Sequence, residues 1–378
     1  MRPESYDKKV GLVLQGGGAL GSYQAGVYEA LATSEYMLDW VAGISIGAIN
    51  AAIIAGNAPE RRVQQLRSFW EEVTAPTKLW LLPMTAWMPS RWQYRASALA
   101  TLMFGQPSFF TPRLPQDWLS SDKCISYYET SALKQTLERL VDFDRINTVK
   151  DLRLSVGAIN IRTGEFAYFD SEQIPIRVEH IMASGALPPG FPPVEIDGEQ
   201  YWDGGLFSNT PLQHMVDYYP RRSRLIFQVD VFAASGRVPT NFDEVNEREK
   251  DIRYASRTMN ATDNLREKHN VRHAINELHK LLPGDLASTD QAKLLYEYGC
   301  VTQMDIVQLI YGPIEPEGAL KDFEFSRSTM EARWQQGLSD ARSTLQVSPW
   351  LEPIPREVGV RVFDNQHGSL SGDCRTAR

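Results

Sequence analysis

The stretch from Gly43 to Gly47 carries residue types suited to nucleophilic catalysis. It reads Gly-Ile-Ser-Ile-Gly, the G-x-S-x-G pattern, and lies where an apolar run changes to helical spacing. A serine at such a strand-to-helix turn adopts a strained backbone conformation, and the flanking glycines let neighbouring backbone pass closely. The pattern therefore predicts acyl transfer through Ser45. The alternative is that these small residues only allow a helix to pack closely on a sheet.

A glycine-rich stretch precedes it at residues 16–21, with the G-x-G-x-x-G spacing of a loop that binds a dinucleotide pyrophosphate. A dinucleotide fold also needs an acidic residue near the end of its second strand. Here Asp39 precedes the apolar part of that strand, and Ser45 follows its end. We therefore interpret the loop as an oxyanion hole, in which the N–H groups of Gly17 and Gly18 meet the charge of a tetrahedral intermediate. Dinucleotide binding stays the alternative.

The serine hydroxyl needs an adjacent base, and the residues themselves leave two arrangements open. The order Ser45, Asp203, His214 fits the triad of an α/β-hydrolase, although that fold builds several strands before its serine. Asp203 also follows an apolar hairpin and precedes Gly204-Gly205, a position from which its carboxylate can point into a cleft. Taken alone, one aspartate before two glycines is more typical of an ordinary turn.

The elements that must position these residues follow an α/β pattern. Apolar runs suited to buried parallel strands alternate with segments of helical spacing, so we expect residues 8–235 to form one α/β domain. The predicted strands lie in KVGLVLQ, YMLDWVAGIS, LRLSVGAIN, GEFAYFD and SRLIFQVDVF, and the first helices in GSYQAGVYEALATS and IGAINAAIIAG. Residues 78–113 interrupt the pattern with an irregular, aromatic-rich stretch.

Residues 236–362 are predicted to form a second, mostly helical domain. Residues 241–282 contain no proline and have apolar residues at helix-compatible intervals, which predicts one long helix or a helical pair. The run MDIVQLIYG predicts one more strand, and SRSTMEARWQQGLSDARSTL a closing amphipathic helix. Residues 363–378 are polar and predict a flexible tail.

Four blocks of the chain together resemble the patatin-like phospholipase family. They are GLVLQGGGALGSYQAGVYEAL, GISIGAINAA, ASGALPPGFPPV and DGGLFSNTP, within roughly residues 8–220. The resemblance implies a three-layer α/β/α sandwich with a mainly parallel sheet. The region after residue 235 is similar to the additional C-terminal domain of certain bacterial members, and its role is not implied.

The resemblance also implies roles for the site residues. Ser45 matches the family's nucleophile and Asp203 its general base, a Ser–Asp dyad that needs no histidine. The glycines that match its oxyanion loop are Gly16, Gly17 and Gly18. Many members carry a basic residue where this chain has Leu20, so charge assistance from that position is absent. We therefore predict a serine lipid acyl hydrolase of the phospholipase A or esterase type. The alternative is a non-enzymatic lipid-binding or scaffold protein on the same fold.

Composition limits the partners. The net charge of −8 argues against nucleic acid, and no apolar run approaches the length of a bilayer span. The polar start lacks the apolar core of a secretory signal, and three scattered cysteines form no disulfide framework. We expect a cytoplasmic protein that meets a lipid or other ester substrate at a membrane or lipid surface, with C-terminal helices that are candidates for a homodimer contact.

Two further patterns are weaker. His269 and His273 are four residues apart on a predicted helix near His279, but no glutamate lies between them, so we expect a solvated face and neither metal nor cofactor. The irregular insertion contains Trp80 and Trp87 among leucines, methionines and phenylalanines, which suits a lipid boundary. It is predicted to form a mobile cap over Ser45. The alternative is an irregular part of the core.

Overall fold

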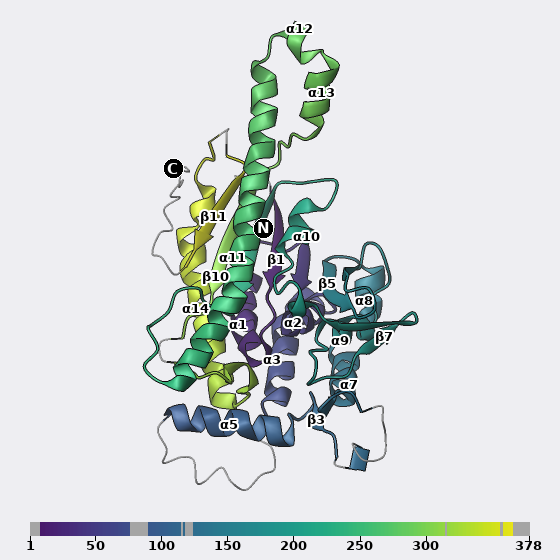
Figure 1. Cartoon of the computed structure of the whole chain (residues 1–378), viewed down its shortest axis with the longest axis vertical. Helices are drawn as coiled ribbons and strands as arrows, with labels where there is room; N and C mark the ends of the chain where they lie inside the picture. The colour runs from purple at the N-terminus through teal and green to yellow at the C-terminus, as the bar shows by residue number, and fades with distance from the viewer. Residues whose placement is uncertain are drawn as a thin grey trace.

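A nine-stranded sheet forms the centre of the protein (Figure 1). The computed structural model describes residues 8–75, 90–114, 116–117, 124–313, 316–355 and 358–365. The strand order is β11-β10-β9-β1-β2-β5-β8-β7, with β6 also paired to β5. The pairs from β11 to β5 are parallel, and β6, β7 and β8 form antiparallel pairs. The strands of this sheet are β1 (Lys9–Leu14), β2 (Trp40–Gly43), β5 (Arg153–Asn160), β6 (Phe166–Asp170), β7 (Val194–Ile196), β8 (Glu199–Asp203), β9 (Arg224–Asp230), β10 (Met304–Ile310) and β11 (Val360–Asp364).

Helices connect the strands and cover the sheet, and a short pair, β3 (Thr111–Pro112) and β4 (Tyr128–Glu129), lies apart from it. The helices are α1 (Gly21–Ala32), α2 (Ile46–Ala55), α3 (Arg62–Val73), α5 (Ser90–Phe104), α7 (Ser131–Leu140), α8 (Phe143–Thr148), α9 (Val178–Ser184), α10 (Leu212–Asp217), α11 (Phe242–Leu281), α12 (Gly284–Ala287), α13 (Asp290–Glu297) and α14 (Arg327–Val347). None of the described helices is long and apolar enough to cross a membrane.

The central strands are apolar on both faces because helices cover both. Along β1, Leu12 and Leu14 pack into a core with α1, α2, α3 and α14, whereas Val13 points to the opposite face. There it packs with Met215 of α10 and Leu265 of α11. Burial of alternate residues on both faces explains why these strands read as continuous Val/Ile/Leu runs. The predicted α/β class with a mainly parallel sheet is therefore confirmed.

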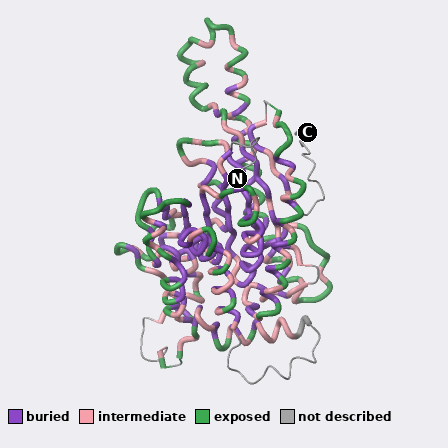
Figure 2. The backbone as a smooth tube through the Cα atoms, turned by 180° about the vertical axis from the view of Figure 1, so that it is seen from behind, coloured by how far each residue is buried: buried purple, intermediate pink, exposed green. Residues whose placement is uncertain are grey.

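The C-terminal region is built into this frame. Strand β10 continues the sheet beside β9, and residues 242–281 form one helix rather than a pair, which runs along the sheet in Figure 1. Its far end, with α12 and α13, projects beyond the sheet and is largely exposed in Figure 2. The predicted domain boundary at residue 235 stays a prediction, and strands from both sides of it share one sheet.

Two segments differ from the sequence-based expectations. Residues 90–104 form helix α5 where an irregular stretch was expected, while Trp80 and Trp87 lie outside the described residues. The prediction that a flexible tail begins at residue 363 is wrong for its first residues. Phe363 is buried and belongs to β11, which was missed because a short edge strand has little apolar periodicity.

Helices α1 and α14 pack so closely that glycines are required at their contact. A Cβ added to Gly26 would lie 1.9 Å from the Trp334 carbonyl oxygen, and one on Gly337 would lie 2.1 Å from the Tyr23 carbonyl oxygen. Each distance is far below van der Waals contact with backbone that cannot rotate away. The N-terminal and C-terminal helices therefore meet backbone to backbone.

We expect Gly26→Ala and Gly337→Ala each to destabilise the fold by about 1–3 kcal/mol, since the added methyl forces the helices apart. Urea unfolding measures the change. Gly284→Ala is the matched control, because a Cβ there meets nothing within 4 Å. Equal stability of all three variants would contradict the close contact.

Candidate active site

Ser45 occupies a strained turn between β2 and α2. Its backbone has φ 55° and ψ −123°, a conformation that a residue with a side chain rarely adopts. A Cβ on Gly43 would lie 2.2 Å from the Gly47 carbonyl oxygen, and one on Gly47 would lie 2.4 Å from the Leu14 carbonyl oxygen. Both glycines are therefore needed for the turn to pack over the end of β1. The Ser45 N–H donates to the Ser184 hydroxyl at 3.1 Å.

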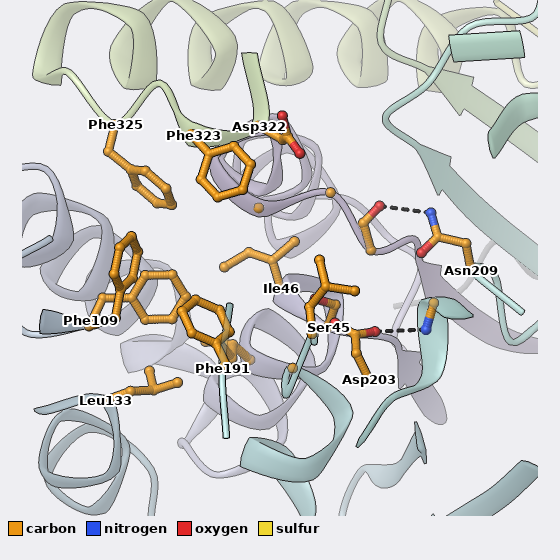
Figure 3. Close-up of a pocket in the computed structure, with 18 of the residues that line it drawn as sticks. Ser45, Ile46, Phe109, Leu133, Phe191, Asp203, Asn209, Asp322, Phe323 and Phe325 are labelled. Carbon is orange, nitrogen blue, oxygen red and sulfur yellow. Dashed lines mark hydrogen bonds between the residues drawn. The ribbon is translucent and has the colours of Figure 1, made fainter. Parts of the chain in front are cut away.

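The glycine loop at the end of β1 lies directly beside this turn. Gly16 donates its N–H to the Asn209 carbonyl oxygen at 3.2 Å, and the Asn209 side chain donates back to the Gly16 carbonyl oxygen at 2.9 Å (Figure 3). The Gly16 N–H is thus bound to Asn209 and is not available to an oxyanion. The absence of a side chain at Gly16 lets the loop approach Ser45 closely, because a Cβ there would lie 3.1 Å from Ser45 Cβ. Within the described chain the N–H groups of Gly17 and Gly18 have no hydrogen-bond partner.

Asp203, at the end of β8, lies beside Ser45 (Figure 3). The pairing of Asp203 with Ala158 of β5 places it at this position, and its side chain is buried. Its Oδ1 accepts the Gly205 N–H at 2.7 Å, and the Ser45 side chain lies close enough to favour the charged carboxylate. Burial raises the pKa of Asp203 to about 7, against the opposing effects of the Ser45 side chain and the Gly205 N–H.

A cleft leads to Ser45, and the empty space in it and in the open solvent at its entrance is about 780 Å³. Figure 3 shows its aromatic wall on one side of Ser45 and Asp203 with Asn209 on the other. The residues of the apolar wall include Ile46, Phe109, Leu133, Phe191, Phe323 and Phe325. Sequence reasoning missed Phe323 and Phe325, which follow β10 in the chain and lie opposite Phe109. Nothing in the sequence around residues 323–325 indicated that this segment would pack against a site formed by the N-terminal part of the chain.

His214 is not part of this arrangement. Its Nε2 lies 3.2 Å from Asp170 Oδ2, and its ring stacks on Tyr168 at 3.9 Å. It does not line the cleft that holds Ser45 and Asp203. The triad arrangement is therefore wrong for this chain.

The histidines of α11 also differ from expectation. His269 and His273 are buried against the sheet rather than solvated, and His269 Nε2 lies 2.8 Å from the Thr302 carbonyl oxygen. The expected solvated face is wrong because α11 has a polar inner face, which hydrophobic periodicity does not reveal. In the described residues no group of three or more side chains could hold a metal ion.

The position that would bind a ribose in a dinucleotide fold holds no acid. Asp39 lies before β2, where it accepts the Val10 N–H at 2.8 Å and a bond from Lys9 at 2.8 Å. Ser45 follows the other end of the strand. The structure therefore gives no support to dinucleotide binding at the glycine loop.

Comparison with known families agrees with this geometry. A family model described as patatin-like phospholipase matches residues 12–216, and one described as patatin phospholipase matches residues 252–357. The chain belongs to the patatin-like phospholipase family. The expectation of a bacterial member stays a prediction.

Individual relatives are more distant or much longer. Lysophospholipase nte1 of Aspergillus terreus is 49% identical over 241 residues, which are 63% of this chain and 13% of that protein. This chain thus spans a small part of that relative's length. VipD from Legionella pneumophila has a TM-score of 0.42 at 15% identity, covering 92% of this chain and 69% of its own. Human GIVD cytosolic phospholipase A2, in complex with methyl gamma-linolenyl fluorophosphonate, has a TM-score of 0.42 at 12% identity, covering 92% and 59%.

Because the pKa of Asp203 is raised in the folded protein, we expect the stability of the fold to depend on pH. The folded protein holds this proton up to pH about 7, whereas an unfolded aspartate releases it near pH 4, so the stability that depends on Asp203 falls as the pH rises between these values. Asparagine imitates the neutral carboxyl group at every pH. We expect Asp203→Asn to have a higher Tm than the parent at pH 8, by roughly 2–4 °C for each kcal/mol recovered, and a smaller difference at pH 5.

Differential scanning calorimetry at the two pH values measures this difference. Asp285→Asn, at an exposed position on α12, is the matched control and should leave Tm unchanged at both. A lower Tm for Asp203→Asn at pH 8 would show that Asp203 is stabilised as an anion.

Proposed function

We propose that this chain hydrolyses carboxylic ester bonds of lipids through an acyl-enzyme on Ser45. One arrangement carries the proposal: Ser45, held on a strained turn, and the buried Asp203 line the same apolar cleft, and the Ser45 side chain lies close enough to Asp203 to favour its charged form. The family of the chain and the name of its fungal relative agree with a lipid ester as substrate.

The residues divide the reaction between them. Asp203 takes the hydroxyl proton as Ser45 Oγ attacks the ester carbonyl carbon. The free N–H groups of Gly17 and Gly18 are placed to meet the oxyanion of the tetrahedral intermediate. When the C–O bond breaks, the proton passes from Asp203 to the leaving alcohol. Water then attacks the acyl-enzyme, giving its proton to Asp203, and the proton returns to Ser45 Oγ as the fatty acid leaves.

A Ser–Asp dyad can work only if the carboxylate is a better base than an ordinary aspartate. General bases act best when their pKa lies close to the working pH. Burial supplies that basicity here, because it raises the pKa of Asp203 to about 7. Among the described residues that line the cleft there is no histidine, so Asp203 would take the hydroxyl proton without an imidazole between them.

The apolar wall suits the acyl side of the ester. Aromatic rings line it, with Phe109 and Phe191 at a centroid distance of 6.1 Å and Phe109 and Phe325 at 5.8 Å. Such a surface gains free energy from burying methylene groups, about 0.8 kcal/mol for each. A cytoplasmic location, action at a lipid surface and a homodimer stay predictions.

Replacement of either dyad residue tests the proposal. With p-nitrophenyl octanoate we expect Ser45→Ala to lower kcat by about four orders of magnitude or more, and Asp203→Asn by about 10²–10⁴-fold. His214→Ala is the control and should retain near-parental kcat. Circular dichroism checks that each variant is folded.

A fluorophosphonate probe separates an enzyme from a binding protein on the same fold. The parent should be labelled on Ser45, located by peptide mass spectrometry. Folded protein without labelling, or a folded Ser45→Ala variant with full turnover, would overturn the proposal.

The pH dependence follows from the ionised base that the first step requires. We expect kcat/KM for the same ester to be low at acid pH and to rise through an apparent pKa of about 7, as Asp203 loses its proton. A stopped assay between pH 5 and 9 measures the profile. A profile already flat above pH 5 would exclude Asp203 as a base of raised pKa.

A further inference from the structure

One side of α11 lies at the mouth of the cleft. Tyr254 lines the cleft beside Ser45 and stacks on Phe232 at 4.7 Å. Lys250 and Arg257 stand four residues before and three residues after Tyr254, so the three side chains share one side of the helix. Lys250 pairs with Asp322 and Arg257 bonds to Gly205, and both partners line the cleft. The helix therefore brings two cations near the cleft in a protein whose net charge is −8.

Arg257 contacts the backbone two residues after Asp203. Its Nη1 donates to the Gly205 carbonyl oxygen at 3.4 Å, and Gly205 is the residue whose N–H binds Asp203 at 2.7 Å. Asp203 lies on the side of Ser45 away from the aromatic wall in Figure 3, and the contact with Gly205 puts the guanidinium near that side. The acyl chain and Arg257 would then lie on opposite sides of the scissile ester.

The neighbouring charges leave Arg257 as the unmatched cation. Lys250 Nζ pairs with Asp322 at 2.8 Å, and Arg253 pairs with Glu249 one turn earlier on the helix. In the part of the chain that the structure describes, Arg257 forms no ion pair, and its side chain is exposed. A single long bond to a carbonyl oxygen leaves most of its five N–H donors available.

We propose that Arg257 binds an anionic phosphate on the alcohol side of the ester, so that the chain prefers glycerophospholipids over neutral acylglycerols. This inference rests on the proposed ester hydrolysis at Ser45. A guanidinium matches phosphate oxygens with two parallel hydrogen bonds, whereas the hydroxyl groups of an acylglycerol offer no charge. Arg257 is thus a residue that determines specificity and takes no part in the proton transfers.

Two substrates with the same acyl chain test the preference. They are 1-lauroyl lysophosphatidylcholine and 1-monolauroylglycerol, both assayed below their critical micelle concentrations. For Arg257→Gln we expect kcat/KM to fall about tenfold or more on the lysophospholipid, through a higher KM. On the monoacylglycerol the value should stay within about twofold of the parent. Arg257→Lys, which keeps the charge without the planar fork, should lie between parent and glutamine variant on the lysophospholipid.

Arg266→Gln is the matched control. It removes the same charge from the same helix, at an exposed position where Arg266 pairs with Asp263 at 2.9 Å. It should leave the ratio of the two kcat/KM values unchanged. A similar fall in that ratio for Arg266→Gln would show a long-range charge effect and overturn the role of Arg257.

The outcomes separate this inference from the proposed function. Ser45-dependent hydrolysis of both substrates, with an unchanged ratio in Arg257→Gln, would overturn the phosphate contact and leave the ester hydrolysis standing. An equal loss on both substrates would likewise overturn it, because it would show a general effect on the site. Hydrolysis of neither substrate by the parent, or hydrolysis independent of Ser45, would overturn the proposed function and this inference with it.

Discussion

The site depends on a carboxylate that the fold keeps out of water. Asp203 is 1% exposed, and burial of an aspartate is unfavourable unless its charge is stabilised or removed. Here a hydrogen bond from the Gly205 N–H and the nearby Ser45 side chain stabilise the anion without neutralising it. The result is a carboxyl group that both binds and releases a proton near neutral pH. The sheet pairing and the glycine turns all contribute to holding Ser45 against it.

The same frame connects distant parts of the chain to the glycine loop. Gln15, immediately before the loop, accepts the Val231 N–H at 2.6 Å and donates to Thr258 of α11 at 2.9 Å. Asn209 binds the next residue along the loop from both its backbone and its side chain. The loop is therefore fixed by β9, by α11 and by the segment after Asp203. Residues from the C-terminal half hold the site together as well as lining it.

Local patterns predicted what depends on local structure. The buried strands and the turn at Ser45 follow from continuous apolar runs and from a glycine on each side of a serine. The proline-free segment predicted helix but left one long helix and a helical pair both open. Sequence patterns did not reveal contacts between distant segments. Phe323 reaches the cleft only because β10 joins the sheet, and His269 is buried because α11 presents polar residues to the sheet. The occupied amide of Gly16 likewise depends on Asn209, far along the chain.

The close contact between α1 and α14 has a consequence for protein synthesis. Helix α1 leaves the ribosome before α14, the helix that packs against its glycine face. At translation rates of about 5–20 residues per second, the nascent α1 remains uncovered while the residues between the two helices are being made. Its apolar side chains are exposed during that interval, as they are in any chain released before α14 is complete. Chains that end before α14 therefore expose apolar surface of α1, which makes such species prone to aggregation.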